Sequence, residues 1–335
     1  MIKFGIVGMG IRGNLFANTL VQNSYAKLVA VSDVNENNLS KANSSFKANC
    51  YKNYEKMFLK EDLDAVIVAT PDSLHKNIVI EASQRVKNIM IEKPLSTSVE
   101  ECNEMCSAIK NNNVRCLVAF ENRWSLPFIS TKHIIDSSSC GEILHINCKL
   151  NNTLFVPTKM LAWSNNSTPA WFLFPHLVDM ACWLSGKKVT KVYASGFKKK
   201  LIEMGIDTYD SISALVNFEN STTGIFSSTW ILPESMPVVA DQKYDVFCDK
   251  EAITIDLMPQ MLSLCSDQYS LPRVLGTPVY GKLNAPPSLM LNDFVSNIYN
   301  DEGTLANEDD GRVNTIIIEA IHRSLELGQP VEINY

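Results

Sequence analysis

The chain has 335 residues, which exceeds the size at which a single hydrophobic core usually keeps growing, so we expect two domains. Hydrophobic residues make up 46% and charged residues 20% of the chain, which argues against long disorder, a collagen-like repeat or a coiled coil. The formal net charge of −6 argues against a nucleic-acid duplex or an anionic membrane as a bulk partner.

Between residue 1 and about residue 120, short β-branched runs alternate with helix-length amphipathic segments. This alternation is typical of a parallel sheet that is covered by helices. Strands are predicted at residues 2–7, 28–32, 65–69, 88–91 and 116–120, with a weaker one near Cys50. Right-handed crossovers between them would give an open, doubly wound sheet.

After about residue 123 apolar and polar residues alternate, most clearly in 144–150 and 212–218. Period two predicts a sheet with one buried and one polar face. Further strands are expected near 189–196, 222–230, 244–248 and 252–257, and helices over 126–137, 172–184, 288–299 and 310–327. Residues 270–287 are rich in Pro and Gly and are expected to form a loop. The chain is therefore predicted to be α/β, with a second, α+β part built on a large, mostly antiparallel, open sheet.

A glycine motif follows the first predicted strand. Gly8, Gly10 and Gly13 form G-x-G-x-x-G, where the glycines serve a tight turn, close approach of the backbone to a pyrophosphate, and helix-to-strand packing. Asp33 ends the next strand, where an acid accepts hydrogen bonds from the ribose of NAD and repels the extra phosphate of NADP. NAD is therefore the expected cofactor and NADP the less favoured one. The alternative is a helix-packing glycine cluster followed by an ordinary aspartate.

The residues of the glycine loop that would contact the dinucleotide are Gly8, Met9, Gly10, Ile11, Arg12 and Gly13. Two further strand ends carry residues suited to chemistry, namely Thr70 to His75 and Glu92-Lys93-Pro94. In a doubly wound sheet both ends open onto the ligand crevice.

With these motifs the chain resembles the Gfo/Idh/MocA oxidoreductases, named after glucose-fructose oxidoreductase and inositol dehydrogenase. The resemblance runs over essentially the whole sequence. It is carried by the glycine motif, Asp33, the A-T-P-x-x-x-H segment that ends at His75, Glu92-Lys93-Pro94, Asn122-Arg123, His176 to Asp179, and residues 319–328.

The resemblance implies an NAD(P)-dependent dehydrogenase or reductase that acts on the CH–OH group of a sugar, a cyclitol or a derivative. It implies an NAD(P)-binding Rossmann domain over 1–122 and a substrate-binding and oligomerisation domain over 123–335, whose last helix could pack back on the first. It makes Lys93 the catalytic lysine. The residues that it places around the cofactor are Thr70, Pro71, Leu74, His75, Glu92, Lys93, Asn122 and Arg123.

Lys93 suits the chemistry of alcohol oxidation. A base must take the hydroxyl proton while hydride leaves carbon, and a lysine with a pKa near 10.4 is a poor base at neutral pH. Partial burial and a positive nicotinamide ring would lower the pKa of Lys93 toward the useful range. The alternative is a solvated surface lysine.

His176 and Asp179 share one helical face, three residues apart. His176 could relay the proton or bind a substrate hydroxyl, with Asp179 orienting the ring. Alternatively both are structural. Many members of the family carry an Asp four residues before this His, but here that position is Phe172, which leaves open what replaces the acid. Pro175 would either start the helix, placing His176 in its first turn, or kink it.

The segment 151–163 places polar residues before aromatic ones, as a polyol pocket would require. Thr158 and Trp163 are the predicted substrate contacts there, beside Lys93, His176 and Asp179. Plain core or loop positions remain the alternative for Thr158 and Trp163. Residues 206–210 form a further polar cluster, and the sequence leaves open whether it faces the site.

Three functions stay open on the sequence. The first is an NAD-dependent oxidoreductase of a sugar-like alcohol; the second is a glycosidase that oxidises a ring carbon transiently with bound NAD; the third is a silent nucleotide-binding regulator. A homodimer or homotetramer through the open sheet is expected, because the family commonly pairs there. We expect a small-molecule, sugar-like substrate, no nucleic acid, no membrane and no metal.

The nine cysteines form no C-x-x-C pair, so they are expected to be free thiols. Residues 1–17 contain four glycines and Arg12, which disfavours a signal peptide. A cytoplasmic protein is therefore expected.

Overall fold

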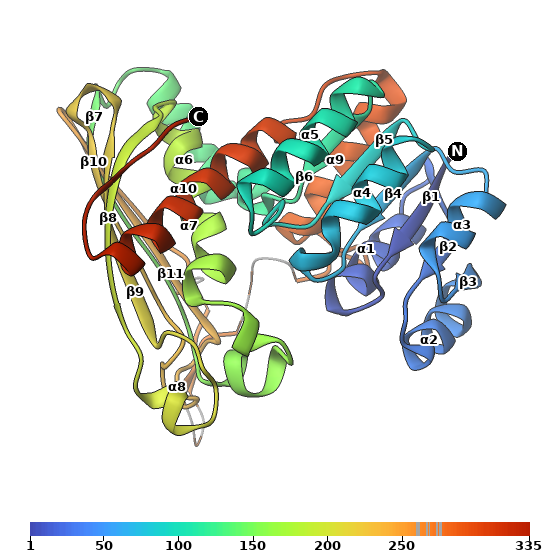
Figure 1. Cartoon of the computed structure of the whole chain (residues 1–335), viewed down its shortest axis with the longest axis horizontal. Helices are drawn as coiled ribbons and strands as arrows, with labels where there is room; N and C mark the ends of the chain where they lie inside the picture. Colours follow the sequence, from blue (N-terminus) through green and yellow to red (C-terminus); the bar gives the residue numbers. More distant parts are fainter. Residues whose placement is uncertain (259–261, 266, 268, 273, 275–276) are drawn as a thin grey trace. The chain divides into compact units, whose positions relative to one another are not determined.

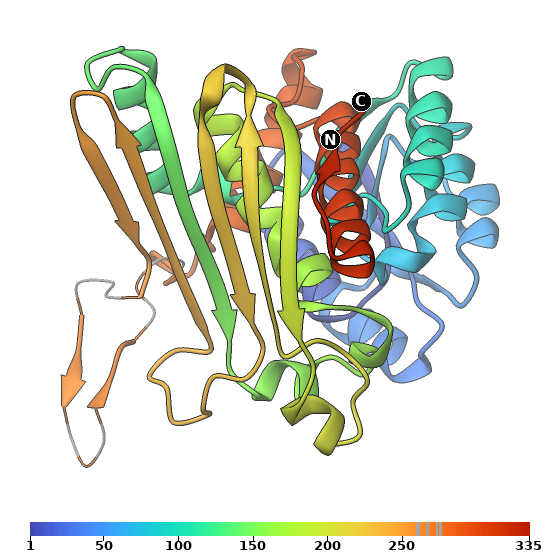
Figure 2. The same cartoon turned by 60° about the vertical axis from the view of Figure 1, so that its left-hand side comes forward.

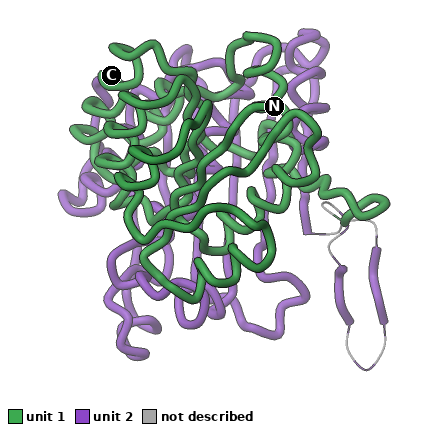
Figure 3. Tube along the Cα trace, turned by 90° about the vertical axis from the view of Figure 1, so that its right-hand side faces the viewer, with its two compact units in different colours: residues 1–124, 276–315 green, residues 125–275, 316–335 purple. Residues whose placement is uncertain are grey.

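The computed structural model describes residues 1–258, 262–265, 267, 269–272, 274 and 277–335. The chain forms two compact units, one of residues 1–124 and 276–315 and the other of residues 125–275 and 316–335 (Figure 3). The predicted domain limits, with a single boundary at 122/123, stay a prediction. The compact units differ from them because residues 276–315 return to the first unit. Residues 273, 275 and 276 of the predicted loop over 270–287 lie outside the described residues.

The first unit contains a six-stranded, fully parallel sheet in the order β3-β2-β1-β4-β5-β6 (Figure 1). Its strands are β1 Ile2–Val7, β2 Ala26–Ser32, β3 Asn49–Tyr51, β4 Ala65–Val68, β5 Asn88–Ile91 and β6 Arg115–Val118. All residues of β4 and β5 are buried, as expected for strands covered on both faces. The predicted doubly wound sheet is confirmed.

Helices surround this sheet. They are α1 Ile11–Val21, α2 Glu36–Phe46, α3 Tyr54–Lys60, α4 His75–Ser83, α5 Val99–Asn111 and α9 Pro286–Asn300, with short 3-10 turns η1 Asp72–Leu74 and η2 Glu121–Trp124. Ser98 caps α5 by accepting a hydrogen bond from the backbone N–H of Glu101 at 3.4 Å. The long helix α10 Glu308–Leu327 begins in the first unit and ends in the second.

The second unit contains a seven-stranded sheet in the order β12-β11-β7-β10-β9-β8-β15. Its strands are β7 Ile143–Asn152, β8 Val189–Phe197, β9 Ser211–Phe218, β10 Thr223–Thr229, β11 Ala240–Cys248, β12 Ala252–Asp256 and β15 Val331–Glu332. Only β7 and β10 pair in parallel, so the sheet is mixed and mostly antiparallel. The predicted fold class is confirmed. A separate pair of two-residue strands, β13 Leu264–Cys265 and β14 Tyr269–Ser270, was not predicted.

One face of this sheet packs against helices, whereas none of the described helices covers the other. In Figure 2 the strands stand in front, with α6 Leu126–Asp136 and α7 Pro169–Ser185 behind them. The predicted alternation holds for Ile146, Cys148 and Leu150 of β7, which are buried on the covered face, but not for Leu144, which is 50% exposed. The remaining short elements are η3 Val156–Met160, η4 Ser164–Asn166, α8 Lys200–Glu203 and η5 Glu219–Ser221.

Helix α7 has defined signals at both ends. The side chain of Thr168 caps its N-terminus by accepting from the backbone N–H of Trp171 at 3.0 Å, and Pro169 follows in the first turn. Gly186, at φ +65°, ends the helix in the left-handed conformation. Pro175 lies inside the helix, so the alternative in which it starts the helix and places His176 in the first turn is wrong.

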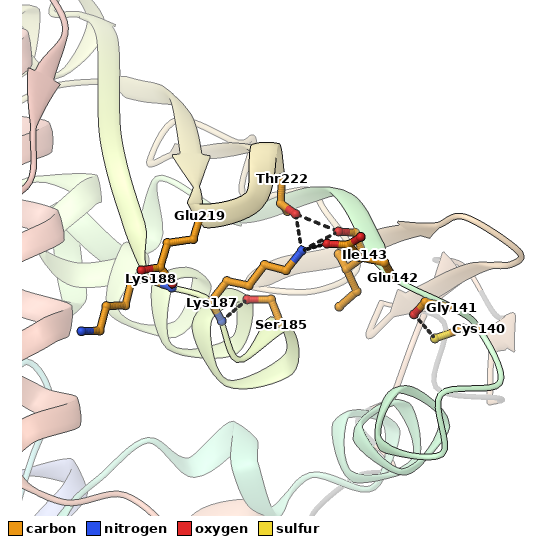
Figure 4. A network of polar contacts seen from close by, with 9 residues as sticks. All are labelled: Cys140, Gly141, Glu142, Ile143, Ser185, Lys187, Lys188, Glu219 and Thr222. Carbon is orange, nitrogen blue, oxygen red and sulfur yellow. Dashed lines mark hydrogen bonds and ion pairs between the residues drawn. The ribbon is translucent and has the colours of Figure 1, made fainter.

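A buried lysine fixes the chain after α7 (Figure 4). The ammonium group of Lys187 donates to the Glu142 carboxylate at 2.7 Å, to the Thr222 hydroxyl at 2.6 Å and to the Ile143 carbonyl at 3.2 Å. Its side chain is only 13% exposed. Lys187 therefore ties the end of α7 to the start of β7 and to the turn before β10.

All nine cysteines are free thiols, and Cys102 and Cys106 lie in the core, as their helical spacing predicts. Cys50 and Cys265 are exposed. Among the described residues, no helix is both long enough and apolar enough to cross a membrane.

Candidate functional site

The turn between β1 and α1 is built around its three glycines. Gly8 has φ +94°, and a Cβ there would lie 2.6 Å from the Ala69 carbonyl oxygen. A Cβ on Gly13 would lie 1.9 Å from the Gly8 carbonyl oxygen, so only glycine fits either position. A Cβ on Gly10 would meet no atom within 4 Å. Gly10 also caps α1 without a side-chain hydrogen bond, which leaves the helix N-terminus open to an anionic ligand.

Asp33 is held beside this turn. Its carboxylate accepts hydrogen bonds from the backbone N–H of Met9 at 2.7 Å and of Asn35 at 2.8 Å, and from the side-chain amide of Asn38 at 3.1 Å. These donors fix the carboxylate at the carboxyl end of β2. The side chain is half-buried and lines a cavity.

The cavity measures about 580 Å³ and lies along the carboxyl ends of β1, β2 and β4. Of the residues predicted from the sequence, those that line it are Gly8, Gly10, Asp33, Thr70, Pro71 and Leu74. Residues that were not predicted also line it, among them Val34, Asn38, Tyr54 and Lys76, and no motif identifies them. The volume suits a small-molecule or cofactor site.

Two observations test whether a dinucleotide fits this cavity. The open space at Gly10 leaves the backbone amides accessible, as a pyrophosphate requires. The Thr70 hydroxyl is buried at the cavity and has no hydrogen-bond partner among the described residues. A buried polar atom without a partner indicates a missing ligand or water. The residues present therefore fit a dinucleotide.

Two predicted cofactor residues have structural partners. His75 is fully buried, and its two ring nitrogens lie 3.1 Å from the carbonyl oxygens of Leu95 and Thr70. Arg123 donates to the Leu305 carbonyl at 2.5 Å and forms an ion pair with Asp310 at 3.1 Å. His75 thus supports the cavity wall from behind, and Arg123 holds the segment that leads into α10.

Asn122, which precedes Arg123 in η2, is buried. Its side-chain nitrogen has no hydrogen-bond partner among the described residues. Neither Asn122 nor Arg123 lines the cavity. Their roles toward the cofactor stay predictions.

Arg12 joins the first turn of α1 to two carboxylates. Its guanidinium lies 2.5 Å from Glu92 and 2.5 Å from Glu121. Burial lowers the pKa of Arg12, but the carboxylates of Glu121 and Glu92 outweigh it, and the net pKa lies above the ordinary value. Arg12 therefore remains a cation and keeps Glu92 in place beside Lys93.

Lys93 follows β5, is half-buried, and forms a cis peptide bond with Pro94. Burial lowers the pKa of the Lys93 ammonium, and the nearby Arg12 cation acts in the same direction. The carboxylates of Glu92, Glu121 and Asp72 oppose this, yet the net pKa lies below the ordinary value. A lowered pKa raises the fraction of Lys93 that is neutral at a given pH.

In the second unit, His176 lies on α7 in the middle of the helix and is half-buried, whereas Asp179 is buried. The phenol of Tyr244 on β11 donates to the His176 carbonyl at 3.2 Å and accepts from the Gln242 amide at 3.0 Å. Burial raises the pKa of Tyr244 well above its ordinary value, so the phenol stays a neutral donor. Tyr244 and Gln242 were missed because their place opposite α7 depends on strand pairing.

The other predicted substrate residues lie near α7 or in the loop before it. The Thr158 hydroxyl donates to the Leu154 carbonyl of its own turn at 2.6 Å, while Trp163 packs against Phe172. The unassigned cluster 206–210 has a structural role at Asp210. Its buried carboxylate accepts from the backbone N–H groups of Lys199, Lys200 and Leu201.

Two family models match the chain. Residues 2–120 match an oxidoreductase family with an NAD-binding Rossmann fold, and residues 128–254 match the GFO/IDH/MocA C-terminal domain. The chain belongs to the Gfo/Idh/MocA family. It is therefore an oxidoreductase, and NAD is the cofactor of its Rossmann unit.

Relatives in this family align over nearly the full length. An uncharacterised oxidoreductase of Bacillus subtilis, YrbE, is 25% identical over 100% of this chain and 97% of its own length. Myo-inositol 2-dehydrogenase of Thermotoga maritima is 22% identical over 99% of this chain and 98% of its own length. The crystal structure of scyllo-inositol dehydrogenase from Lactobacillus casei with NAD(H) and scyllo-inositol superposes with a TM-score of 0.87, at 20% identity over 99% of both chains. The superposition shows that the fold is shared.

The chain departs from the pattern of its family at Phe172. Its ring lies 6.0 Å from that of Trp163 and 5.9 Å from that of Trp230, measured between centroids. Phe172, where the family pattern given above predicts an acid, is therefore part of an aromatic cluster. Trp230 was not among the predicted site residues. Its position directly after a strand of alternating buried and exposed residues is the sequence feature that could have indicated it.

Proposed function

We propose that this protein transfers hydride between NAD and a secondary alcohol or ketone of a sugar, a cyclitol or a derivative. The observation that supports it is Lys93, a half-buried lysine with a lowered pKa at a strand end of the NAD-binding unit. Relatives named myo-inositol 2-dehydrogenase and scyllo-inositol 2-dehydrogenase, which align over 99% of the chain, support the substrate class.

In this mechanism Lys93 moves the proton. NAD, when bound in the glycine cradle, accepts or returns the hydride. In the direction of oxidation the neutral Lys93 amine takes the proton from the substrate hydroxyl, and in the direction of reduction the ammonium gives it back to the carbonyl oxygen. Glu92, held by Arg12, keeps a negative charge beside Lys93 and stabilises the ammonium after proton transfer.

His176 is proposed to bind a substrate hydroxyl, because its side chain is half-buried on α7 while its backbone is fixed by Tyr244. Asp179 is proposed to support it from the buried side of the helix. Trp163 offers a ring face to the substrate, and Thr158 a hydroxyl.

Asp33 supports a preference for NAD over NADP. Three donors hold its carboxylate at the cavity, where it can accept hydrogen bonds from ribose and repel an added phosphate. We expect NADH to bind more tightly than NADPH. Substituting Asp33→Ser should narrow that difference; an unchanged ratio of the two dissociation constants would remove Asp33 from this role.

The function is tested with a panel of sugars, polyols, cyclitols and keto-sugars with NAD(H) and NADP(H), following nicotinamide absorbance. We expect NAD-dependent turnover of at least one secondary alcohol, with kcat/KM for oxidation rising with pH through a pKa below 10.5 because Lys93 must lose its proton. Absence of turnover with every compound, in a protein that binds NADH, would refute the proposal.

We also propose that the protein pairs with itself through the uncovered face of the second sheet. Tyr193, Leu215 and Ile225 lie opposite one another on β8, β9 and β10 and are each more than 40% exposed. An apolar row across three strands favours burial in a homodimer or homotetramer. Light scattering at micromolar concentration tests this: Leu215→Asp should shift the mass toward a monomer, and a monomeric unmodified protein would contradict it.

A further inference from the structure

Three aromatic side chains form a wall beside the N-terminal half of α7. The ring of Phe172 stands edge-on to Trp163 and Trp230, with centroids about 6 Å apart in both pairs. Trp163 and Phe172 are half-buried, and Trp230 is fully buried. His176 follows Phe172 by four residues and so lies on the same face of the helix. We refer to Trp163, Phe172 and Trp230 as the aromatic wall.

Three buried polar atoms at the end of the sheet belong to side chains in or beside this wall. They are the indole nitrogen of Trp230, the Ser228 hydroxyl and the amide oxygen of Asn152, and none has a hydrogen-bond partner among the described residues. Ser228 and Trp230 alternate with Phe226, whose ring packs against Phe174 of α7, so they belong to the face that α7 covers.

Asn152 ends β7, the neighbouring strand, where its carbonyl accepts from the backbone N–H of Leu232 at 3.2 Å. The three atoms therefore come from adjacent chain segments. Folded proteins satisfy nearly all buried polar groups, so three unsatisfied ones on neighbouring strands call for a bound molecule or water that supplies their partners.

The chemistry of these atoms restricts that molecule. An indole N–H donates, an amide oxygen accepts and a hydroxyl does both, and none of them carries charge. Gln242 and Tyr244, on the same covered face, are neutral as well. A phosphate or carboxylate placed there would lose its water without gaining a countercharge, whereas hydroxyl groups would find partners.

Phe172 restricts which groups the bound molecule can carry on the edge that faces the phenyl ring. A phenyl ring neither donates nor accepts a conventional hydrogen bond, so a substrate hydroxyl pressed against it would be buried unpaired. A carbon–hydrogen or methyl edge would pack against it instead. We propose that the aromatic wall and the three unsatisfied atoms form a subsite for an uncharged, hydroxylated ring that turns a deoxy or otherwise apolar edge toward Phe172. This inference rests on the proposed function, since it narrows the substrate class of that reaction.

The test measures kcat/KM for NAD reduction with D-glucose, D-galactose, their derivatives deoxygenated singly at carbon 2, 3, 4 or 6, and their 6-phosphates. The unmodified protein should prefer at least one deoxy compound to its parent by about tenfold or more, and should not prefer a phosphate. Phe172→Asp should reverse the deoxy preference, because the carboxylate can pair with the hydroxyl. Phe172→Leu is the matched apolar control and should still prefer the deoxy sugar to its parent.

Binding of NADH, followed by nicotinamide fluorescence, reports on folding and on the cofactor site in all variants. The subsite would be overturned if every parent sugar had a higher kcat/KM than its deoxy derivatives. It would also be overturned if Phe172→Asp left the ratio of kcat/KM for deoxy and parent sugars unchanged. In both cases turnover would still support the proposed function. NADH binding without turnover of any sugar, polyol, cyclitol or keto-sugar would overturn both. Preference for a 6-phosphate over its parent would overturn the uncharged substrate class.

Discussion

At the β1–α1 turn of the first unit the surface offered to a ligand is backbone, whereas around α7 of the second unit it consists of side chains. Gly8 and Gly13 leave no room for a Cβ, and Gly10 exposes amides. Around α7, by contrast, Trp163, Phe172 and His176 present rings. A site made of backbone binds one kind of ligand, because nearly any side chain added there would block the ligand's approach. A site made of side chains can change its substrate through a single residue, as Phe172 illustrates.

The largest effect is expected at Lys93, a side chain of the first unit, where the glycine turn otherwise offers backbone to the ligand. Replacing Lys93 by Ala removes the proposed proton acceptor, so kcat should fall by about 10²- to 10⁴-fold while NADH affinity is retained. Steady-state kinetics and nicotinamide fluorescence measure the two effects separately. Lys93→Arg, which keeps the charge but cannot release its proton, should be equally slow in alcohol oxidation. Near-normal turnover in either variant would remove Lys93 from the chemistry.

The glycine cradle can be broken in two distinct ways. Ala at Gly13 would place a Cβ 1.9 Å from the Gly8 carbonyl oxygen, so the backbone must shift, and we expect a loss of about 1–3 kcal/mol in the free energy of unfolding together with loss of NADH binding. Ala at Gly10 meets no protein atom within 4 Å, so stability should be unchanged while NADH binding weakens. Thermal unfolding and NADH titration of both variants check this. Unimpaired NADH binding by Gly10→Ala would show that the cofactor does not approach the backbone there.

The same contrast explains what the sequence could predict. The strands of the first sheet were predicted to within two residues, because β4 and β5 are wholly buried and, apart from Asn88, consist of apolar residues. The glycine loop was predictable because its constraint is local: spacing alone decides which residues can turn and which can approach.

Long-range partners were not predictable. Arg123 pairs with Asp310, which lies 187 residues away in the sequence, and His75 contacts the Leu95 carbonyl. Because the sequence does not show these partners, both residues were predicted as cofactor ligands. Trp230 and Tyr244 gain their positions only through the pairing of β7 with β10 and β11. The interior position of Pro175 was equally hidden, because Pro169, six residues earlier, already starts α7.

Lys187 tests how far the side-chain architecture of the second unit supports α7. Lys187→Met removes hydrogen bonds to Glu142, Thr222 and the Ile143 carbonyl, and should lower the free energy of unfolding by about 1–3 kcal/mol. The matched control is Lys188→Met, the next residue and an exposed one, which should cost about 0.5 kcal/mol or less. Thermal unfolding measures both. Equal effects of the two substitutions would mean that the buried contacts of Lys187 do not stabilise the unit.

The smallest expected effect concerns the other end of α7, where His322 supports the cap. Its Nε2 lies 2.8 Å from the Thr168 hydroxyl, its Nδ1 lies 2.8 Å from the Ile318 carbonyl, and its ring stacks on Trp171. Because a carbonyl only accepts, Nδ1 carries a proton, and in the neutral ring Nε2 then accepts from the Thr168 hydroxyl. Burial lowers the pKa of His322, although the Ile318 carbonyl and Glu326 oppose it.

Acidification should therefore weaken the second unit. As the pH falls below about 6.5, the unfolded chain binds a proton at His322 that the folded chain does not, so the free energy of unfolding decreases. The loss should approach the value of one helix cap, about 1 kcal/mol, and appear as a lower melting temperature between pH 7 and pH 5.5. His322→Gln, which stays neutral and can still accept from Thr168, should flatten that dependence while leaving NADH binding in the backbone-built unit unchanged. An identical pH profile in the two proteins would show that His322 does not titrate against folding, and that the cap of α7 is held by Thr168 alone.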